Sequence, residues 1–466
     1  MSIAIAIIGA GGFRWGPLNI RDILLDPLLA GSTVTLWDID KTALDLVYEY
    51  GCFVESCAPY GSRVHRASSE DEALSGQDVI LLTINVGGLE LMRKEMDWTQ
   101  RCGLLQPVGD TIGPAGFSRA LRHLPVVLAL AEKAERASPG ALMLNTTNPL
   151  TLLNQALVSR CELPVIGVCH EPHHVLNSLM WLFSLDDDSE ISYTLSGQNH
   201  CSWLFDLSID NRPLVSRWCE AGGTVDTVPV SPDLPAPAPQ EGQAVWYAMR
   251  RLYHSSHGQE PEGRQESDLY ALFLNFYVFS RTGYFPACRP RHFAEFFRNW
   301  ITPETQWGQL LGVPLTTVRS RTLYRQAQRD LVKGSLEKQD GSGLVLSERE
   351  IVPVIRSYVC DTGESLFVNI SSGLHSCIPQ FIHEYRGPVN HSSLMAPPEL
   401  PHALRSMHRF IHQQYQNWID ATLKQDENLM LQVLERDPSA HHIKDKEHYL
   451  QGILWLNQPV GRPCAA

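Results

Sequence analysis

The chain lacks several features that mark whole classes of protein. No uninterrupted apolar run approaches the ~20 residues of a membrane-spanning helix, so no membrane partner is expected. Positive charge is not in excess: the formal net charge of the 466 residues is -13, which argues against nucleic acid or an anionic membrane surface as the main partner. Internal repeats are missing, which excludes a solenoid. Hydrophobic residues make up 44% of the chain, so it can bury a large core and is not globally disordered.

Paired cysteine motifs are also missing. The eleven cysteines are odd in number, irregularly spaced and include no C-x-x-C pair, so neither a zinc ribbon nor a thioredoxin-like centre is expected. We interpret them as reduced thiols and predict a cytoplasmic protein. The first residues have no basic segment before their apolar run and turn glycine-rich at Gly9, which predicts a strand and not a signal peptide. The cysteines are Cys52, Cys57, Cys102, Cys161, Cys169, Cys201, Cys219, Cys288, Cys360, Cys377 and Cys464.

Apolar strands alternate with helical patterns in the first part of the chain. The strands are expected at 3–8, 33–37, 78–85, 141–145 and 164–168, with a helix from near Pro17 and another around 119–136. Such alternation indicates βαβ units and a mostly parallel sheet. We therefore predict an α/β fold in which residues 1–197 form a Rossmann-type, NAD-binding domain.

Beyond Gln198 the pattern changes. Residues 203–209 predict a strand, and the proline-rich segment 229–239 predicts an exposed, extended loop. Helical patterns occupy 244–253, 269–282, 317–338 and 402–436. We predict that residues 198–466 form a second, α-rich (α+β) domain that packs against the carboxyl edge of the sheet. The whole arrangement resembles the lactate and malate dehydrogenases.

A glycine-rich turn follows the first predicted strand. Gly9, Gly11 and Gly12 lie between that strand and a helix, where glycine lets the backbone approach a pyrophosphate. Asp38 ends the next strand, and a carboxylate there can accept both ribose hydroxyls and repels a 2′-phosphate, which favours NAD over NADP. The pattern departs from G-x-G-x-x-G because Arg14 replaces the third glycine. The alternative is a tight βα turn followed by a surface aspartate.

The segment Cys169-His170-Glu171-Pro172 comes directly after the apolar run 164–168. A thiol and an imidazole at the carboxyl end of a strand suggest a metal site, a proton-transfer site, or both. The alternative is a buried structural cysteine beside a hydrogen-bonded histidine.

Other polar segments end strands of the same sheet or stand beside them. They are Asn85-Val86-Gly87-Gly88, the loop 109–117, Asn145-Thr146-Thr147-Asn148-Pro149 and Gly197-Gln198-Asn199-His200. Each by itself is compatible with an ordinary turn, because Asn, Gly and Pro dominate turns. Together, at one sheet edge, they favour a binding site. The spacing between Cys169 and His200 has no metal signature of its own, and Tyr284 by itself is compatible with a packed aromatic residue.

In this order and spacing the segments resemble glycoside hydrolase family four, the NAD- and divalent-metal-dependent glycosidases. The resemblance spans most of the chain. The matching stretches are 8–12, 86–90, 109–117, 145–149, 169–172 and 199–200, with late matches at 369–373, 378–379 and 398–401.

The resemblance implies roles for individual residues. Cys169 and His200 correspond to the metal ligands, with Mn²⁺ as the usual ion. His170 is expected to protonate the leaving oxygen, Asp110 to lie near the metal, and Tyr284 to act as the base. The sugar is expected to contact Asn148 and Glu171. The residues expected to bind NAD are Gly9, Gly11, Gly12, Asp38 and Asn85.

The resemblance also implies a mechanism. NAD would take a hydride from C3 of the sugar, and the metal would polarise the resulting ketone and so acidify the C2 proton. A base would remove that proton, the glycosidic oxygen would leave by elimination, water would add, and the hydride would return to C3.

The substrate is predicted less directly. His170 resembles relatives that act on non-phosphorylated glycosides or uronides, Pro172 resembles 6-phospho-β-glucosidases, and Glu171 resembles relatives that act on galacturonosides or glucuronosides. We predict a non-phosphorylated hexopyranoside or hexuronide. A 6-phospho-glycosidase, a lactate/malate-type dehydrogenase and a non-catalytic NAD-binding regulator remain as alternatives. The resemblance further suggests a homodimer or homotetramer, with substrate, metal and oligomer contacts in residues 198–466.

Overall fold

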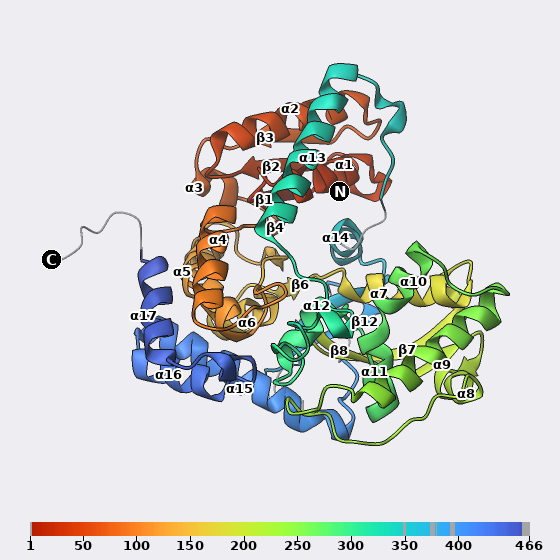
Figure 1. Cartoon of the computed structure of the whole chain (residues 1–466). Coiled ribbons are helices and arrows are strands. Elements are labelled where there is room, and N and C mark those ends of the chain that lie inside the picture. Colours follow the sequence, from red (N-terminus) through yellow and green to blue (C-terminus); the bar gives the residue numbers. More distant parts are fainter. Residues whose placement is uncertain (1, 348–350, 373–377, 379, 392–396, 459–466) are drawn as a thin grey trace.

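The computed structural model describes residues 2–347, 351–372, 378, 380–391 and 397–458 (Figure 1). Four residues singled out in the sequence, Gly373, Cys377, Pro379 and Cys464, lie outside this part of the chain. Within the described part, none of the helices combines the length and the apolar character needed to cross a membrane.

An eight-stranded sheet forms the centre of the Rossmann half. Its order is β12 (Ile382–Pro388), β11 (Ser365–Ser371), β6 (Val165–Gly167), β5 (Leu142–Asn145), β4 (Val79–Leu82), β1 (Ala4–Ile8), β2 (Thr33–Trp37) and β3 (Arg63–Arg66). The strands from β6 to β3 pair in parallel, whereas β11 is antiparallel to both β6 and β12. The mostly parallel sheet predicted from the apolar runs is therefore confirmed.

Helices cover both faces of this sheet. The helices of this part of the chain are α1 (Trp15–Leu25), α2 (Lys41–Cys57), α3 (Glu70–Leu74), α4 (Gly88–Arg101), α5 (Gly113–Ala137), α6 (Leu150–Arg160) and α7 (Glu171–Phe183). Because side chains alternate along a strand, Ile5 and Ile7 of β1 enter one hydrophobic core while Ala6 and Ile8 enter the other. Burial on both faces explains why these strands are continuously apolar.

A smaller sheet, built on the antiparallel hairpin of β7 (Ile191–Gln198) and β8 (Cys201–Ile209), opens the second half. β10 (Phe285–Pro286) and β9 (Arg212–Pro213) pair with β8. The strand predicted at 203–209 is confirmed and begins at Cys201. In Figure 1 this sheet lies beside α8 (Leu214–Glu220), α9 (Pro239–His257) and α11 (Phe273–Thr282).

The remaining helices are α10 (Arg264–Tyr270), α12 (Pro290–Phe293), α13 (Val318–Lys338), α14 (Ile351–Cys360), α15 (His402–Lys424), α16 (Glu427–Arg436) and α17 (Lys446–Leu456). The prediction of one continuous helix at 402–436 was wrong, because two helices, α15 and α16, occupy this range. Gln425 takes a positive φ of 55° and ends α15, and the Asp426 side chain caps α16. The pattern expected at 269–282 covers the last two residues of α10, the turn at residues 271–272 and the whole of α11.

The domain boundary expected between residues 197 and 198 does not separate two sheets, because both parts of the chain contribute strands to the large sheet. β11 and β12 come from the second part of the chain and extend the sheet beyond β6. α14 likewise packs into the core that contains Ile5 and Ile7. Both parts of the chain thus contribute to one sheet and one core, and the division into two domains stays a prediction.

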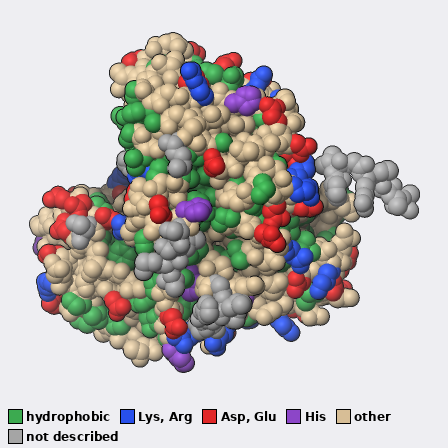
Figure 2. Space-filling model, turned by 180° about the vertical axis from the view of Figure 1, so that it is seen from behind, with side chains coloured by type: hydrophobic (Ala, Val, Ile, Leu, Met, Phe, Trp, Pro, Cys, Tyr) green, Lys and Arg blue, Asp and Glu red, His purple; other side chains and the backbone are tan. Residues whose placement is uncertain are grey.

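Charge is mixed on the surface. On the face shown in Figure 2, acidic and basic side chains are interspersed over the described residues. The acidic excess of the sequence is thus spread out on this face and is not gathered into one field.

Candidate active site

The strands β1, β4, β5 and β6 run in parallel, so their carboxyl ends meet at one edge of the sheet. The segments that follow them begin at Gly9, Thr83, Thr146 and Val168. In open α/β sheets ligands bind outside this edge. The topology thus gathers the glycine turn, Asn85, Asn148 and Cys169 along one edge.

Cys169 and His200 lie side by side. The distance from Cys169 Sγ to His200 Nε2 is 3.3 Å, although the residues are 31 apart in the chain. Cys169 follows β6, and His200 occupies the two-residue turn between β7 and β8. His200 has a φ of 64°, which is uncommon for a residue with a side chain and recurs at functional sites.

The His200 ring is held from its other side. Its Nδ1 lies 2.6 Å from Thr111 Oγ1, and Thr111 Oγ1 also donates to Asp110 Oδ1 at 3.2 Å. Burial lowers the pKa of His200 well below its usual range, so the imidazole is neutral. Its Nε2 therefore points toward Cys169 in the form that binds metals.

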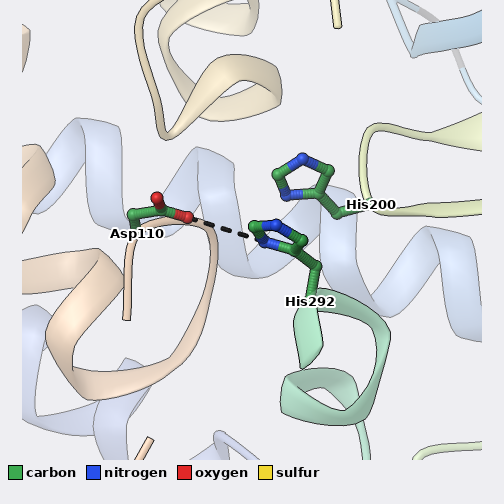
Figure 3. Close-up of side chains that lie close together, drawn as sticks. All are labelled: Asp110, His200 and His292. Atoms are coloured by element: carbon green, nitrogen blue, oxygen red, sulfur yellow. Dashed lines mark ion pairs between the residues drawn. The ribbon is translucent and has the colours of Figure 1, made fainter. Parts of the chain in front are cut away.

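Asp110 and His292 complete a buried cluster around His200 (Figure 3). Asp110 comes from the loop before α5, and His292 from α12. The His200 and His292 ring centroids are 4.1 Å apart, and His292 Nδ1 lies 3.8 Å from Asp110 Oδ1. Burial alone would raise the pKa of Asp110, but the charges of Arg321 and His292 hold it well below its usual value. Asp110 is thus an ionised carboxylate.

Glu171 lies in the first turn of α7 and is buried in an ion-pair network. Arg289 donates to it from Nε at 3.0 Å, from its backbone N at 3.2 Å and from Nη2. His292 Nε2 lies 3.4 Å from Glu171 Oε1. Burial would raise the pKa of Glu171, but His292 and Arg289 lower it well below its usual value. Because its oxygens already have protein partners, Glu171 fits a positioning role, and its predicted contact with sugar stays a prediction.

His170 is the residue before α7. Its ring lies 5.4 Å from that of Trp15 and 4.8 Å from that of His174. Burial lowers the pKa of His170 to about 3, so the imidazole is neutral at pH 7. A neutral imidazole is a weak proton donor, which is unfavourable for the predicted acid role.

The glycine turn has the shape expected of a dinucleotide site. Gly9 has a φ of 92°, and a Cβ there would lie 2.5 Å from Thr83 O. Gly11 N donates to Asp38 Oδ2 at 2.8 Å, which ties the turn to the end of β2. Gly12 is exposed, so its backbone is open to a ligand. Gly16 was missed: a Cβ at this position of α1 would lie 2.0 Å from Ala10 O, so it supplies the close helix–strand contact of the absent third glycine.

The other predicted residues are placed less tightly. Asn85 is exposed at the end of the β4 segment, and Asn148 is half-buried, with its Oδ1 accepting from Leu150 N at 3.2 Å. Tyr284 lies one residue before β10, whose Phe285 pairs with Leu204. At ~3.3 Å per residue the register puts Tyr284 roughly 13 Å along the strand from Cys201. Its ring packs against the hydrophobic core, a placement that disfavours it as the base.

Several residues of this site were not found from the sequence. They are Thr111, Arg289, Arg291, His292 and Arg321. The basic run Arg289-Pro290-Arg291-His292 in an acidic chain was the available signal.

Comparison with known proteins finds relatives in one glycosidase family. A model of the family 4 glycosyl hydrolases matches residues 4–184. An α-galacturonidase of Bacillus subtilis (strain 168) is 25% identical over 363 residues, which cover 76% of this chain and 73% of that protein. An α-galactosidase of Rhizobium meliloti (strain 1021) is 30% identical over 212 residues, 45% of this chain and 43% of that protein. The resemblance of the sequence to family 4 of the glycosyl hydrolases is confirmed over residues 4–184.

Solved structures agree with this family 4 fold. The crystal structure of lplD from Bacillus subtilis has a TM-score of 0.78 at 23% identity and covers 98% of this chain and 99% of its own. The 6-phospho-β-glucosidase from Thermotoga maritima, solved with manganese, NAD⁺ and glucose-6-phosphate, has a TM-score of 0.70 at 18% identity over 98% of both chains. Cryptosporidium parvum malate dehydrogenase reaches 0.50 at 13% identity, so the expected likeness to that fold is confirmed.

Proposed function

We propose that this family 4 glycosidase uses NAD and Mn²⁺ to cleave a hexuronide by oxidation at C3 followed by elimination. The observation that carries the proposal is the 3.3 Å separation of Cys169 Sγ and His200 Nε2 at the carboxyl edge of the NAD-type sheet. The Thermotoga maritima relative was solved with manganese and NAD⁺, and both fit the residues present here.

The side chains fit a metal ion. Two atoms that each lie ~2.0–2.3 Å from one ion are separated from each other by a distance close to the 3.3 Å between Cys169 Sγ and His200 Nε2. The Thr111 contact at His200 Nδ1 leaves Nε2 for the ion, as in many metal sites. Burial raises the pKa of the Cys169 thiol, and a bound divalent cation would lower it and stabilise the thiolate. Asp110 and His292 are within reach to complete or orient this set.

The glycine turn fits a dinucleotide. The absence of a Cβ at Gly9 and at Gly11 lets the turn pack closely against Thr83 and Asp38, and the exposed Gly12 leaves backbone open to a ligand. Asp38 follows β2, where a carboxylate of a Rossmann fold can accept from ribose hydroxyls. When bound, the metal would act as a Lewis acid and NAD as the hydride acceptor. The chain would hold the sugar between Asn148 and the Cys169–His200 pair, while Asp110 and Glu171 orient the imidazoles and guanidinium groups around it.

An anionic substrate suits the charges around the site. Arg289, Arg291 and Arg321 surround it, and their carboxylate partners are Glu171 and Asp110. The buried Nε of Arg291 has no acceptor among the described residues. A guanidinium group binds a carboxylate in a paired, planar geometry, which favours a uronide. Relatives named α-galacturonidase support the same choice.

A direct test is hydrolysis of nitrophenyl uronides, hexosides and 6-phosphoglycosides with NAD⁺, Mn²⁺ and a thiol reductant. We expect the uronide to be cleaved best, with deuterium at C2 of the released sugar when the reaction runs in deuterated water. Product carrying only protium at C2 would rule out elimination. Stoichiometric NADH formation from a hydroxy acid without need of Mn²⁺ would instead identify a dehydrogenase.

The metal assignment is tested by Cys169→Ser. We expect this variant to lose Mn²⁺ binding and at least ~10²-fold of the Mn²⁺-dependent activity, and to keep its NAD⁺ affinity. Cys161→Ser is the matched control, because Cys161 is a half-buried thiol at the end of α6. Full activity of Cys169→Ser would overturn the assignment.

A further inference from the structure

A cavity of about 450 Å³ lies beside the glycine turn, away from the Cys169–His200 pair. Phe13, Asp40 and Leu89 line one side, and they follow β1, β2 and β4 respectively. The volume lies within the range of small-molecule sites, and the position is the crevice where Rossmann folds receive dinucleotides.

The opposite wall of this cavity is α13, from the second part of the chain. Arg325 and Arg329 line it. Their guanidinium carbons lie 5.6 Å and 5.8 Å from the centroid of the Phe13 ring. The guanidinium carbon of Arg14, just after the glycine turn, lies 5.6 Å from the ring centroid of Tyr324 on the same helix α13. Figure 1 shows α13 running across this half of the molecule beside α2, against which it packs.

Three arginines lie along one face of α13. Arg321, Arg325 and Arg329 are spaced four residues apart, which puts them along one face of the helix over roughly 12 Å. Arg321 pairs with Asp110 at 3.1 Å, so one end of this arginine stripe reaches the candidate active site. Arg325 and Arg329, at the other end, face the cavity.

Two buried N–H groups of this arginine stripe lack a hydrogen-bond acceptor among the described residues. Arg329 Nε is buried and has no acceptor among the described residues, and the same holds for Arg321 Nε. Arg325 has a loose ion pair with Asp40 at 3.6 Å and is half exposed. A buried N–H without an acceptor is costly, so an acceptor on a ligand would satisfy it. The α13 face of the cavity thus has unused binding capacity for oxygen atoms and for a flat ring.

We propose that Arg325 and Arg329 of α13 bind the adenosine half of the dinucleotide, so that a helix outside the Rossmann segment forms the outer wall of the cofactor site. This inference rests on the proposed function, because it requires a bound NAD. One helix then contacts both the cofactor pocket and, through Arg321, the candidate active site.

The experiment measures binding by titration calorimetry on the full chain with Mn²⁺ present. The probes are NAD⁺, ADP-ribose for the adenosine half, and nicotinamide mononucleotide for the other half. We expect Arg329→Ala and Arg325→Ala each to weaken NAD⁺ and ADP-ribose on the order of tenfold and to leave nicotinamide mononucleotide unchanged. Arg319→Ala is the control, since it removes the same charge from an exposed position of α13 away from the stripe.

The outcomes distinguish failure of the proposed function from failure of the role given to Arg325 and Arg329. If the unmodified chain does not bind NAD⁺, the proposed function fails, and this inference with it. If it binds NAD⁺ and both stripe variants bind NAD⁺ and ADP-ribose as tightly as Arg319→Ala, only the inference is overturned.

Discussion

Asp110 and Glu171 are buried carboxylates, and both stay ionised because guanidinium and imidazole groups surround them. His200 is buried and His170 is half-buried, and the loss of solvent keeps both imidazoles neutral. Two charged acceptors and two neutral bases are thus brought within one small region. At the scale of residues, the second part of the chain sets these states through His292, Arg289 and Arg321.

Buried histidines also make the stability depend on pH. His408 of α15 accepts from Trp203 Nε1 at 2.9 Å, which requires a neutral ring, and burial lowers its pKa to about 3. Since the unfolded-state value is ~6.5, the stabilisation is present above pH ~6.5 and is lost as pH falls toward 3. Between pH 7 and pH 5 we expect His408 to account for about 2 kcal/mol of lost stability.

Thermal unfolding of His408→Gln at both pH values checks this. The variant removes the titrating ring, so its loss of stability between pH 7 and pH 5 is expected to be smaller. His402→Gln, an exposed change on the same helix, is the control and is expected to keep the original pH dependence. Equal pH dependence of the His408 and His402 variants would contradict the argument.

At the scale of elements, close contact between α1 and the glycine turn after β1 depends on Gly16. A methyl group there would lie 2.0 Å from Ala10 O, so Gly16→Ala must push the helix away from the glycine turn. We expect a loss of ~1–3 kcal/mol in unfolding free energy and weaker NAD⁺ binding. Chemical denaturation and NAD⁺ titration measure the two effects.

Gly334 of α13 provides the matched substitution. No heavy atom lies within 4 Å of a Cβ placed there, so Gly334→Ala is expected to stabilise the helix by ~0.5–1 kcal/mol. If Gly16→Ala were as well tolerated as Gly334→Ala, the close helix–strand contact would not be needed.

At the scale of the whole molecule, the Rossmann half depends on later segments. β11 covers the edge of β6, and Arg356 of α14 pairs with the buried Asp26 at 3.0 Å. Removing residues after 197 would expose an apolar core and leave Asp26 without this partner. We expect the fragment 1–197 to be insoluble or to unfold without a cooperative transition.

Size-exclusion chromatography and circular dichroism of the fragment test this expectation. Co-expression with residues 198–466 is expected to restore a soluble complex, which controls for toxicity or degradation. A monomeric fragment that binds NAD⁺ and unfolds cooperatively would show that residues 1–197 are an independent domain after all.

Local patterns in the sequence determined the parallel strands, the glycine turn, and the segments around Cys169 and His200, because backbone periodicity and turn chemistry act over a few residues. Order and spacing of those segments also indicated the family. Only the tertiary structure decided that Cys169 lies beside His200, that Arg289 and His292 contact Glu171, and that α13 lines the cavity beside the glycine turn. These contacts join residues far apart in the chain, and burial and charge at such contacts follow from packing, which local sequence does not encode.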